Sequence, residues 1–286
     1  MSELTSHTTT VEGLTLHWTE IGSGDPVLLL HGWPTSAFLY RNVMPHIAAA
    51  GRRAIALDLP GFGKSDKPLD ASYSFRFYDR HLSGFLDALE LEQTGLVVHD
   101  LGGPVGLHWM VGHPDRVSAL GLLNTIVQTK QSWAVVAFML ALRIPGLRGL
   151  TVSPWGLEMA MKIGTHSPGG SAPEVVAGVQ APFVEKDARK ALIKSIAGLH
   201  PKGFETFAAA MPSLTIPVCM VYGTGDRILP DVPRVFPRLA AELGLPADRV
   251  HALDGCGHFL QEDKPDEVGR LLGAFFGETR SGAPIP

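Results

Sequence analysis

The sequence predicts an α/β fold, a mostly parallel twisted sheet flanked by helices and interrupted by one helical insertion. Short apolar runs alternate with amphipathic stretches, Gly-containing turns follow several of these runs, and the alternation stops in one internal segment. Strands and helices that alternate at this spacing pair in parallel through right-handed crossovers. The chain has 286 residues, 45% of them hydrophobic, so it can bury a large core.

The predicted elements follow in order along the chain. Segment 11–21 is expected to be a strand or hairpin, and 26–31 is a continuous apolar run typical of a buried strand. Further strands are expected at 53–58, 94–100, 117–123, 217–222 and 249–253, and helices at 38–50, 75–91, 103–111, 232–243 and 266–276. Residues 126–211 lack the alternation and are rich in proline, which predicts a helical cap on a core domain of residues 1–125 and 212–286. The apolar segment 133–142 is expected to face the pocket beneath this cap.

Composition and charge narrow the class of protein. The charge sum of 24 − 28 = −4, without a long basic run, argues against a nucleic acid or an anionic membrane surface as partner. The two cysteines, Cys219 and Cys256, cannot form a disulfide framework. No signal peptide is recognised at the N-terminus, and the longest apolar run is shorter than the roughly 18 residues of a membrane span. A cytoplasmic location is therefore expected, and no oligomeric state is predicted.

Two patterns that suggest a cofactor fail on inspection. Residues 61–65 end like a phosphate-binding loop, but Asp58 stands where that loop needs its first glycine. None of the 12 histidines has the His-Glu-x-x-His spacing of a zinc site. Neither a nucleotide nor a metal is expected.

The segment Leu96–Gly106 has the layout of a nucleophile elbow, a sharp turn between a strand and a helix. Asp100 occupies the turn, and Gly102 and Gly103 supply the small neighbours that such a strained turn requires. This turn aims the Asp100 side chain at the carboxyl ends of the strands, where ligands bind in open sheets. The free N–H groups of the following helix favour an ionised carboxylate. For Asp100 alone, a helix N-cap is the alternative interpretation.

Three further loops at strand ends support a catalytic role for Asp100. His258 follows the last predicted strand, and Asp226 follows the strand before it, so Asp226 can orient the His258 ring. Asp100, Asp226 and His258 thus occur in the order nucleophile, acid, base. The segment Leu30–Pro34 follows an early strand, and the backbone N–H groups of Trp33 and Leu101 are expected to form an oxyanion hole.

These residues lie in four segments that resemble one known superfamily: residues 31–42, 58–65, 97–103 and 257–263. Over nearly its whole length the chain resembles the α/β-hydrolase superfamily, and within it the haloalkane dehalogenases and the related epoxide hydrolases. The resemblance implies an α/β-hydrolase fold with a helical cap, Asp100 as nucleophile, His258 as base, and no cofactor. One group of dehalogenases places the third acid after the sixth strand. Asn124 stands there in this chain, so the acid role falls to Asp226 as in the other group.

Two related substrate classes are disfavoured. Epoxide hydrolases use two cap tyrosines, whereas the four tyrosines of this chain all lie outside the predicted cap, at Tyr40, Tyr73, Tyr78 and Tyr222. Val98, two residues before Asp100, also matches dehalogenases, because epoxide hydrolases usually have glycine there. Fluoroacetate dehalogenases bind the substrate carboxylate with arginines just after the nucleophile, and this chain has none in that stretch.

The chain also departs from the dehalogenase pattern at the halide site. Leu101 replaces the usual tryptophan after the nucleophile, and Trp33 stands where asparagine or glutamate is common. Trp33 is therefore expected to supply a substitute halide donor, and Trp133 or Trp155 from the cap could supply a second. Simple packing remains the alternative interpretation for each tryptophan. Phe38, Trp133 and Trp155 are also expected to line the substrate pocket.

The sequence thus predicts a haloalkane dehalogenase-like hydrolase that forms an alkyl-Asp100 ester, which water activated by His258 then hydrolyses. The expected partners are a small apolar haloalkane or epoxide and water. An epoxide hydrolase or another Asp-nucleophile hydrolase is the alternative. A ligand-binding protein without activity is disfavoured because a binder has no need of a general base, and a serine esterase because the elbow has no serine.

Overall fold

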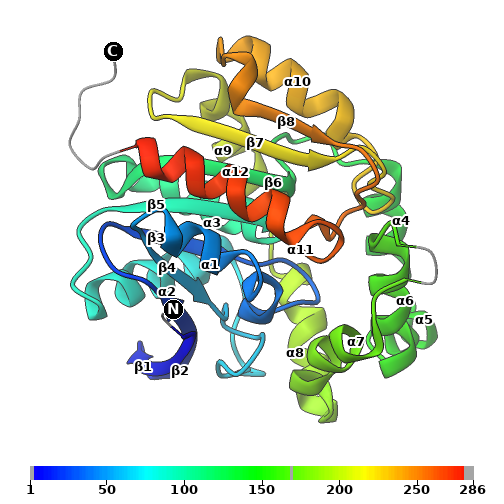
Figure 1. The fold of residues 1–286 in the computed structure, drawn as a ribbon. Coiled ribbons are helices and arrows are strands. Elements are labelled where there is room, and N and C mark those ends of the chain that lie inside the picture. The colour runs from blue at the N-terminus through cyan, green and yellow to red at the C-terminus, as the bar shows by residue number, and fades with distance from the viewer. Residues whose placement is uncertain (1–2, 168–169, 280–286) are drawn as a thin grey trace.

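The computed structural model describes residues 3–167 and 170–279, and an eight-stranded sheet forms the centre of this part of the chain (Figure 1). The strands are β1 (Thr5–Val11), β2 (Leu14–Ile21), β3 (Pro26–Leu30), β4 (Arg53–Leu57), β5 (Thr94–Asp100), β6 (Val117–Thr125), β7 (Val218–Gly223) and β8 (Val250–Leu253). Their order in the sheet is β1-β2-β4-β3-β5-β6-β7-β8. The pairs β1–β2 and β2–β4 are antiparallel and all other neighbours are parallel, which confirms the predicted fold class.

Helices cover both faces of the sheet. Along β3, Leu28 and Leu30 contribute to an apolar cluster with one set of helices, and Val27 and Leu29 contribute to a second cluster on the opposite face. The first set is α2 (Phe75–Ala88), α3 (Gly102–Gly112) and α10 (Val232–Glu242), and the second is α1 (Met44–Ala49) and α12 (Pro265–Glu278). Because both faces are buried, the parallel strands are continuously apolar, as predicted from the sequence.

Two predicted elements have different limits. The helix expected at 38–50 is a 3₁₀ turn, Ala37–Tyr40, followed by the separate α1, which begins with Pro45 in its first turn. Proline fits that position because the first N–H groups of a helix have no partner within the helix. The hairpin begins earlier than residue 11, because β1 is a polar edge strand with mostly exposed threonines and so lacks an apolar signal.

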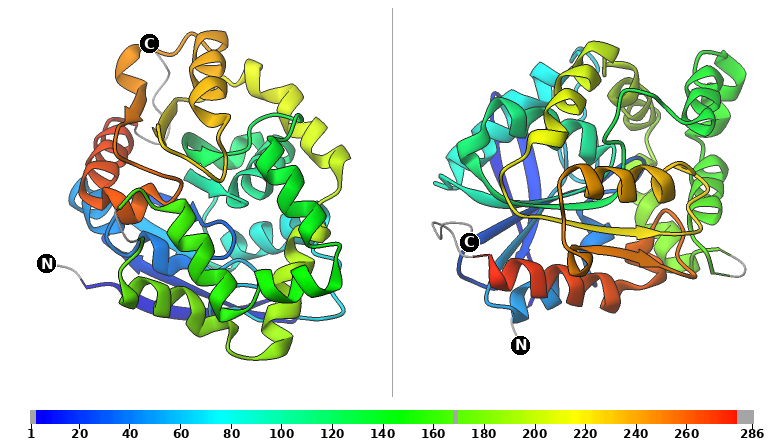
Figure 2. Two further views of the ribbon diagram at one scale, coloured as in Figure 1. Left: turned by 90° about the vertical axis from the view of Figure 1, so that its right-hand side faces the viewer. Right: turned by 90° about the horizontal axis from the view of Figure 1, so that it is seen from above.

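Most of the residues between β6 and β7, which the sequence predicts to form a cap, are helical. The helices are α4 (Trp133–Ala141), α5 (Pro145–Thr151), α6 (Pro154–Gly164), α7 (Pro173–Gln180), α8 (Lys186–Ala197) and α9 (Pro201–Ala210). Prolines open four of them, at Pro145, Pro154, Pro173 and Pro201. α4, α5 and α6 lie at the outer edge of the molecule, at the right of Figure 1 and nearest the viewer in the left panel of Figure 2. α9, in contrast, packs against α3 of the core.

A buried carboxylate, that of Asp58 directly after β4, links the loops after β3 and β4 to strand β2. Asp58 Oδ1 accepts a hydrogen bond from the Ala37 N–H at 2.7 Å, and Oδ2 accepts one from the Lys64 N–H at 2.8 Å. His17 Nδ1 on β2 lies 2.7 Å from the same Oδ2 atom. Burial alone raises the pKa of Asp58, but hydrogen bonding to His17 and the backbone outweighs this and holds the pKa below its usual value. Asp58 therefore helps to fix the loop after β3, which includes Trp33.

Replacement of this carboxylate should destabilise the fold. Asp58→Ala leaves the buried Ala37 N–H and the partly buried Lys64 N–H without an acceptor and removes the partner of His17, so we expect the free energy of unfolding to fall by about 3–5 kcal/mol. Urea denaturation followed by circular dichroism measures it. Asp66→Asn is the control, since the exposed Asp66 carboxylate accepts a bond from the Thr15 N–H and its neutralisation should cost less than about 1 kcal/mol. Equal midpoints for both variants would contradict the role assigned to Asp58.

Candidate active site

Asp100 lies at a strained turn where the last residue of β5 leads into α3. Its φ is +48°, a left-handed conformation that is costly for residues other than glycine. Small neighbours make the turn possible: a Cβ atom at Gly32 would lie 2.3 Å from the Asp100 Cβ, and one at Gly103 would lie 1.6 Å from Thr125 Oγ1. The loop after β3 and the end of β6 therefore pack directly against the turn. This geometry confirms the predicted elbow.

Backbone groups and a histidine surround the Asp100 carboxylate. The Trp33 N–H donates to Oδ1 at 2.7 Å, and the Leu101 backbone also donates to the carboxylate. His258 Nε2 lies 3.3 Å from Oδ2, within ion-pair distance but without the angles of a hydrogen bond. The side chain of Asp100 is 14% exposed, whereas that of His258 is fully buried. The carboxylate thus sits at the surface of a cavity with the imidazole behind it.

Asp226 holds the other side of the His258 ring. His258 Nδ1 lies 2.9 Å from Asp226 Oδ2. The Asp226 Oδ1 atom accepts hydrogen bonds from the Ile228 N–H at 2.8 Å and the Leu229 N–H at 2.7 Å. Because these bonds fix the carboxylate, Asp226 orients the ring and keeps the Nδ1 proton directed towards itself. The structure therefore brings together the three residues expected from the sequence.

The charges of this set are strongly coupled. Burial alone lowers the pKa of His258, but the Asp226 and Asp100 carboxylates outweigh it and raise the pKa to about 10. Burial raises the pKa values of Asp100 and Asp226, and the nearby His258 with the backbone N–H donors lowers both below their usual values. At neutral pH the set therefore consists of two carboxylates and one imidazolium. Asp100 is therefore ionised.

Asn124 has a role that the sequence did not reveal. It stands at the end of β6, and its Nδ2 donates to Asp226 Oδ2 at 2.8 Å and to the Gly257 carbonyl at 3.0 Å. Its Oδ1 accepts from the Gly223 N–H at 2.9 Å. Asn124 therefore joins the ends of β6 and β7 to the loop that carries His258. The signal in the sequence is an asparagine directly after the strand expected at 117–123, but it names no partner.

His99 is a second buried neighbour that the sequence did not single out. Its ring packs on His258 with 4.7 Å between centroids, and its Nε2 lies 3.0 Å from the His258 carbonyl oxygen. Burial, together with the charge of His258, lowers the pKa of His99 to about 3. The ring is therefore neutral, and Nε2 carries the proton because a carbonyl oxygen only accepts. His99 supports the backbone of His258 without adding charge to the site.

The cavity above Asp100 is about 290 Å³ in volume and almost entirely apolar. Residues from α4, α6, α8 and the loop after β7 join the elbow and the Trp33 loop in its lining: Trp33, Pro34, Asp100, Leu101, Ile126, Ala134, Val135, Phe138, Met139, Ala160, Ile163, Ile196, Arg227, Ile228 and Leu229. Four of these lie on α4, which confirms that the apolar segment 133–142 faces the pocket. Such a cavity suits a small apolar molecule with its reacting atom next to a carboxylate.

The two residues expected at the oxyanion and halide site both border the cavity. Each provides a backbone N–H near the Asp100 carboxylate, but neither side chain offers a free donor. The Trp33 indole N–H donates to the Leu192 carbonyl at 3.3 Å, and the Trp33 ring packs on Phe138 with centroids 4.9 Å apart. The expectation that the Trp33 side chain replaces the missing halide donor is therefore not met. In this structure the indole joins the core to α8.

The prediction that Phe38, Trp133 and Trp155 line this cavity is wrong. The Phe38 ring lies under the Arg41 guanidinium at 3.9 Å and faces Gly178 of the cap. Trp133 is 77% exposed and Trp155 is 58% exposed. Each tryptophan lies within the first two residues of its helix. Helix geometry decides their direction, because the cavity lies beneath a different face of α4 from the one that carries Trp133.

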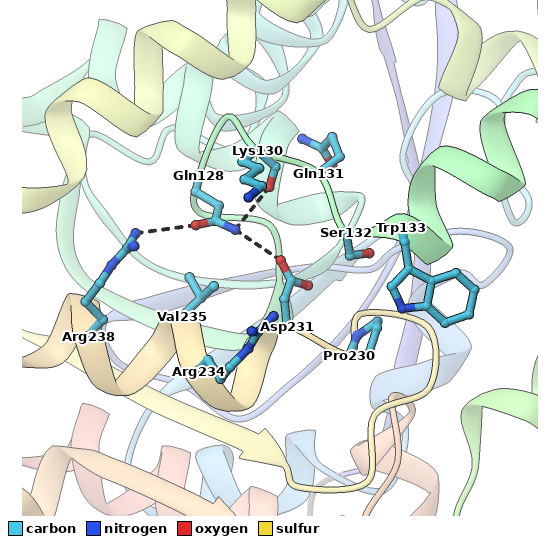
Figure 3. Close-up of a pocket in the computed structure, with 10 residues that line it drawn as sticks. All are labelled: Gln128, Lys130, Gln131, Ser132, Trp133, Pro230, Asp231, Arg234, Val235 and Arg238. Carbon is cyan, nitrogen blue, oxygen red and sulfur yellow. Dashed lines mark hydrogen bonds between the residues drawn. The ribbon is translucent and has the colours of Figure 1, made fainter.

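A second, more polar pocket lies beside the first and includes Trp133. It has a volume of about 460 Å³ and extends from the 128–133 segment to the start of α10 (Figure 3). Gln128 donates to Asp231 Oδ2 and to the Lys130 carbonyl, each at 3.0 Å, and accepts from Arg238 at 3.4 Å. None of the site residues Asp100, Asp226 and His258 borders this pocket. Its volume therefore does not mark it as the reaction centre.

The raised pKa of His258 predicts a pH dependence of stability. The unperturbed pKa is 6.5 and the folded value is about 10, so the folded protein binds more protons between these values. This stabilisation is complete below pH 6.5 and is lost as the pH rises through about 10. Urea denaturation across this range should show a steeper loss of stability for the wild type than for His258→Gln. His200→Gln, at an exposed histidine of the cap, should behave like the wild type; equal slopes for all three proteins would contradict the assignment.

Comparisons with known proteins agree with this geometry. Residues 25–154 match the family model of the alpha/beta hydrolase fold. A haloalkane dehalogenase of Psychrobacter cryohalolentis is 30% identical over 274 residues, covering 92% of this chain and 87% of the relative. The crystal structure of the haloalkane dehalogenase DbeA from Bradyrhizobium elkani superposes with a TM-score of 0.83 at 27% identity, covering 95% of this chain and 97% of that one. The epoxide hydrolase CorEH gives a TM-score of 0.81 at 26% identity, covering 97% of this chain and 100% of that one. The chain is a hydrolase and belongs to the haloalkane dehalogenase family within the α/β-hydrolase fold.

Proposed function

We propose that this protein hydrolyses the carbon–halogen bond of small apolar haloalkanes, with residues 126–211 as the cap over the reaction cavity. The placement of an ionised Asp100 on the floor of an apolar cavity, with His258 and Asp226 behind it, supports this proposal most directly. A carboxylate is a suitable nucleophile for displacement at saturated carbon. The apolar walls keep water away from the nucleophile until the substrate has bound.

In the first step an Asp100 oxygen attacks the carbon that carries the halogen. The new C–O bond forms as the carbon–halogen bond breaks, and the halide leaves with the bonding electron pair. Alkylation removes the negative charge of Asp100, which is one of the two carboxylates that raise the pKa of His258. The pKa of His258 therefore falls, and the imidazole can lose its proton and act as a base.

In the second step His258 takes a proton from a water molecule as its oxygen attacks the carbonyl carbon of the ester. The backbone N–H groups of Trp33 and Leu101 stabilise the negative charge that develops on the Asp100 oxygen. Collapse of the intermediate breaks the bond to the alkoxy group, which takes the proton of the newly formed Asp100 carboxylic acid and leaves as the alcohol. Asp100 is then again a carboxylate, and His258 keeps the proton that it took from water. The overall products are an alcohol, a halide ion and a proton, and no cofactor takes part.

An intact ester provides the test of this mechanism. His258→Gln should leave Asp100 alkylated after incubation with a bromoalkane, seen in intact-protein mass spectrometry as one added alkyl group. Turnover, measured by halide release, should fall by about 10²–10⁴-fold because the general base is lost. The double variant Asp100→Ala/His258→Gln is the control and should show no adduct. Absence of an adduct with every haloalkane and epoxide tested would overturn the covalent route.

The halide site of this chain is weak in side-chain donors. In the part of the chain that the structure describes, only Trp33 and Arg227 contribute side-chain N–H groups to the cavity lining. The Trp33 indole bonds to the Leu192 carbonyl. One Arg227 N–H bonds to the Thr165 carbonyl at 2.5 Å, so among the described lining residues Arg227 alone has further side-chain N–H groups. Leu101 stands next to the nucleophile without any polar group.

Leu101→Trp should therefore accelerate halide release. An added indole N–H beside the leaving group would stabilise the departing anion by about 1.5 kcal/mol, which corresponds to roughly tenfold in kcat/KM for a bromoalkane. Leu101→Phe is the matched control, because it adds an aromatic ring without a donor. If the phenylalanine variant gained as much as the tryptophan variant, packing rather than hydrogen bonding would explain the change.

Epoxide hydrolysis is the second candidate, favoured by the scarcity of halide donors and by the structural likeness to the epoxide hydrolase CorEH. Against it, none of the four tyrosines borders the cavity. Tyr40, Tyr73 and Tyr78 are fully buried in the core, and Tyr40 donates to the Leu30 carbonyl. Diol formation from a panel of epoxides, measured beside halide release from bromoalkanes, separates the two reactions.

A further inference from the structure

The outer helices of the cap carry large apolar side chains that no other described part of the chain covers. These residues, which we call the outer cap surface, are between 45% and 77% exposed: Trp133, Val136, Leu140, Ile144, Leu147, Leu150, Trp155 and Ile163. Only three other large hydrophobic residues of the described chain are comparably exposed, at Leu4, Leu69 and Val184. Soluble monomers rarely have so many exposed apolar side chains in one place, which indicates that this surface binds a partner.

Helix α4 shows why this surface is unusual. All nine of its residues are apolar, yet none of them is fully buried. One face, formed by Ala134, Val135, Phe138 and Met139, lines the cavity above Asp100. The opposite face carries Trp133, Val136 and Leu140 and is exposed. A helix that is apolar on all sides is normally buried on all sides. In the described chain nothing packs over the outer face of α4.

The arrangement of the helices suits contact with a broad surface. α4 packs against α5, and α5 packs against α6, at the outer edge of the molecule (Figure 1; Figure 2, left panel). In the described residues no single helix is long and apolar enough to cross a membrane, and α4 and α5 pass that test only together, with a bend of 111° between them. Helices of this kind can lie in the interface of a bilayer with one apolar face buried.

Charge distinguishes a bilayer from other partners. The sequence has no acidic residue between Asp115 and Glu158, whereas this stretch of the cap contains Lys130, Arg143 and Arg148. Both arginines are exposed and stand next to residues of the outer cap surface. The expectation of no membrane partner rests on the net charge of −4. That sum covers the whole chain and so does not reveal the local excess of cations in this stretch. A two-fold contact with a second copy would bring like charges together, whereas an anionic surface complements them.

We propose that α4, α5 and α6 dock on the surface of an anionic phospholipid bilayer. The apolar side chains of the outer cap surface enter the boundary between headgroups and acyl chains, with the two tryptophans at the interface, where their amphipathic rings are favoured. Arg143 and Arg148 contact the phosphates. Ile163 belongs both to this surface and to the cavity lining, so the cavity lies beside the membrane. Delivery of an apolar substrate from the lipid follows only if the proposed function holds; the docking does not depend on it.

Vesicle co-sedimentation tests the docking. The full-length protein should bind vesicles of phosphatidylglycerol and phosphatidylcholine at low salt, and bind less as the salt concentration rises. Leu140→Gln/Leu147→Gln should lower the partition coefficient about tenfold or more, because two apolar insertions are lost. Arg143→Gln/Arg148→Gln should lower binding to the anionic vesicles but not to pure phosphatidylcholine. Val184→Gln, at a residue 68% exposed outside the surface, is the matched control and should bind as the wild type does.

Circular dichroism verifies that each variant is folded, and halide release from a water-soluble bromoalcohol reports on the reaction separately. Loss of that activity in every protein, the wild type included, contradicts the proposed function but leaves the vesicle result standing. Failure of the wild type to bind anionic vesicles at low salt overturns the docking, as does equal binding by the Leu140/Leu147 variant and the Val184 control. If the wild type forms a dimer in solution but does not bind vesicles, and the Leu140/Leu147 variant is monomeric, the surface binds a second copy of the chain instead.

Discussion

The close contact of three strand ends around the Asp100 carboxylate is the constraint on which the site depends. The turn at Asp100 has a left-handed backbone, and its neighbours Gly32 and Gly103 approach so closely that no Cβ atom fits. This packing places the Trp33 N–H on the carboxylate and gives the nucleophile a fixed direction. The same contacts join the ends of β3, β5 and β6. The packing that holds the sheet together therefore also sets the orientation of the Asp100 side chain.

Electrostatic interactions explain how Asp100 can stay ionised in the free site while His258 can become a base later in the proposed reaction. Two carboxylates surround one buried imidazole, so His258 is protonated while Asp100 is free. Burial would penalise each charge alone, but the ion pairs and the N–H groups that hold Asp226 compensate for it. In the proposed mechanism, alkylation removes the Asp100 charge and so changes the balance in favour of neutral His258. The first step of the proposed reaction would thus prepare the base of the second step.

Helix α4 of the proposed cap has two apolar faces, an inner one towards the cavity and an outer one that is exposed. The inner face of α4 closes the cavity above the nucleophile, and Trp33 joins the core to α8 through its indole N–H. The outer face remains uncovered in the described chain. The geometry gives a physical reason for the apolar composition of residues 133–142, since a helix between an apolar cavity and an apolar partner has no face for polar residues.

Much of the fold and the reactive set can be predicted from the sequence because those features depend on local order along the chain. Continuous apolar runs mark strands buried on both faces, and small residues mark the tight turn. Asp100 ends a strand and Asp226 and His258 each follow one, so parallel topology brings all three to one edge of the sheet. The order of elements along the chain does not determine which way the side chains of the cap helices point. It also does not determine which groups the buried polar side chains bind. Helix rotation turned Trp133 and Trp155 outward, and long-range packing engaged the Trp33 indole with Leu192 and placed Asn124 and His99 behind the base. These contacts join residues far apart in the chain, so only the tertiary structure decided them.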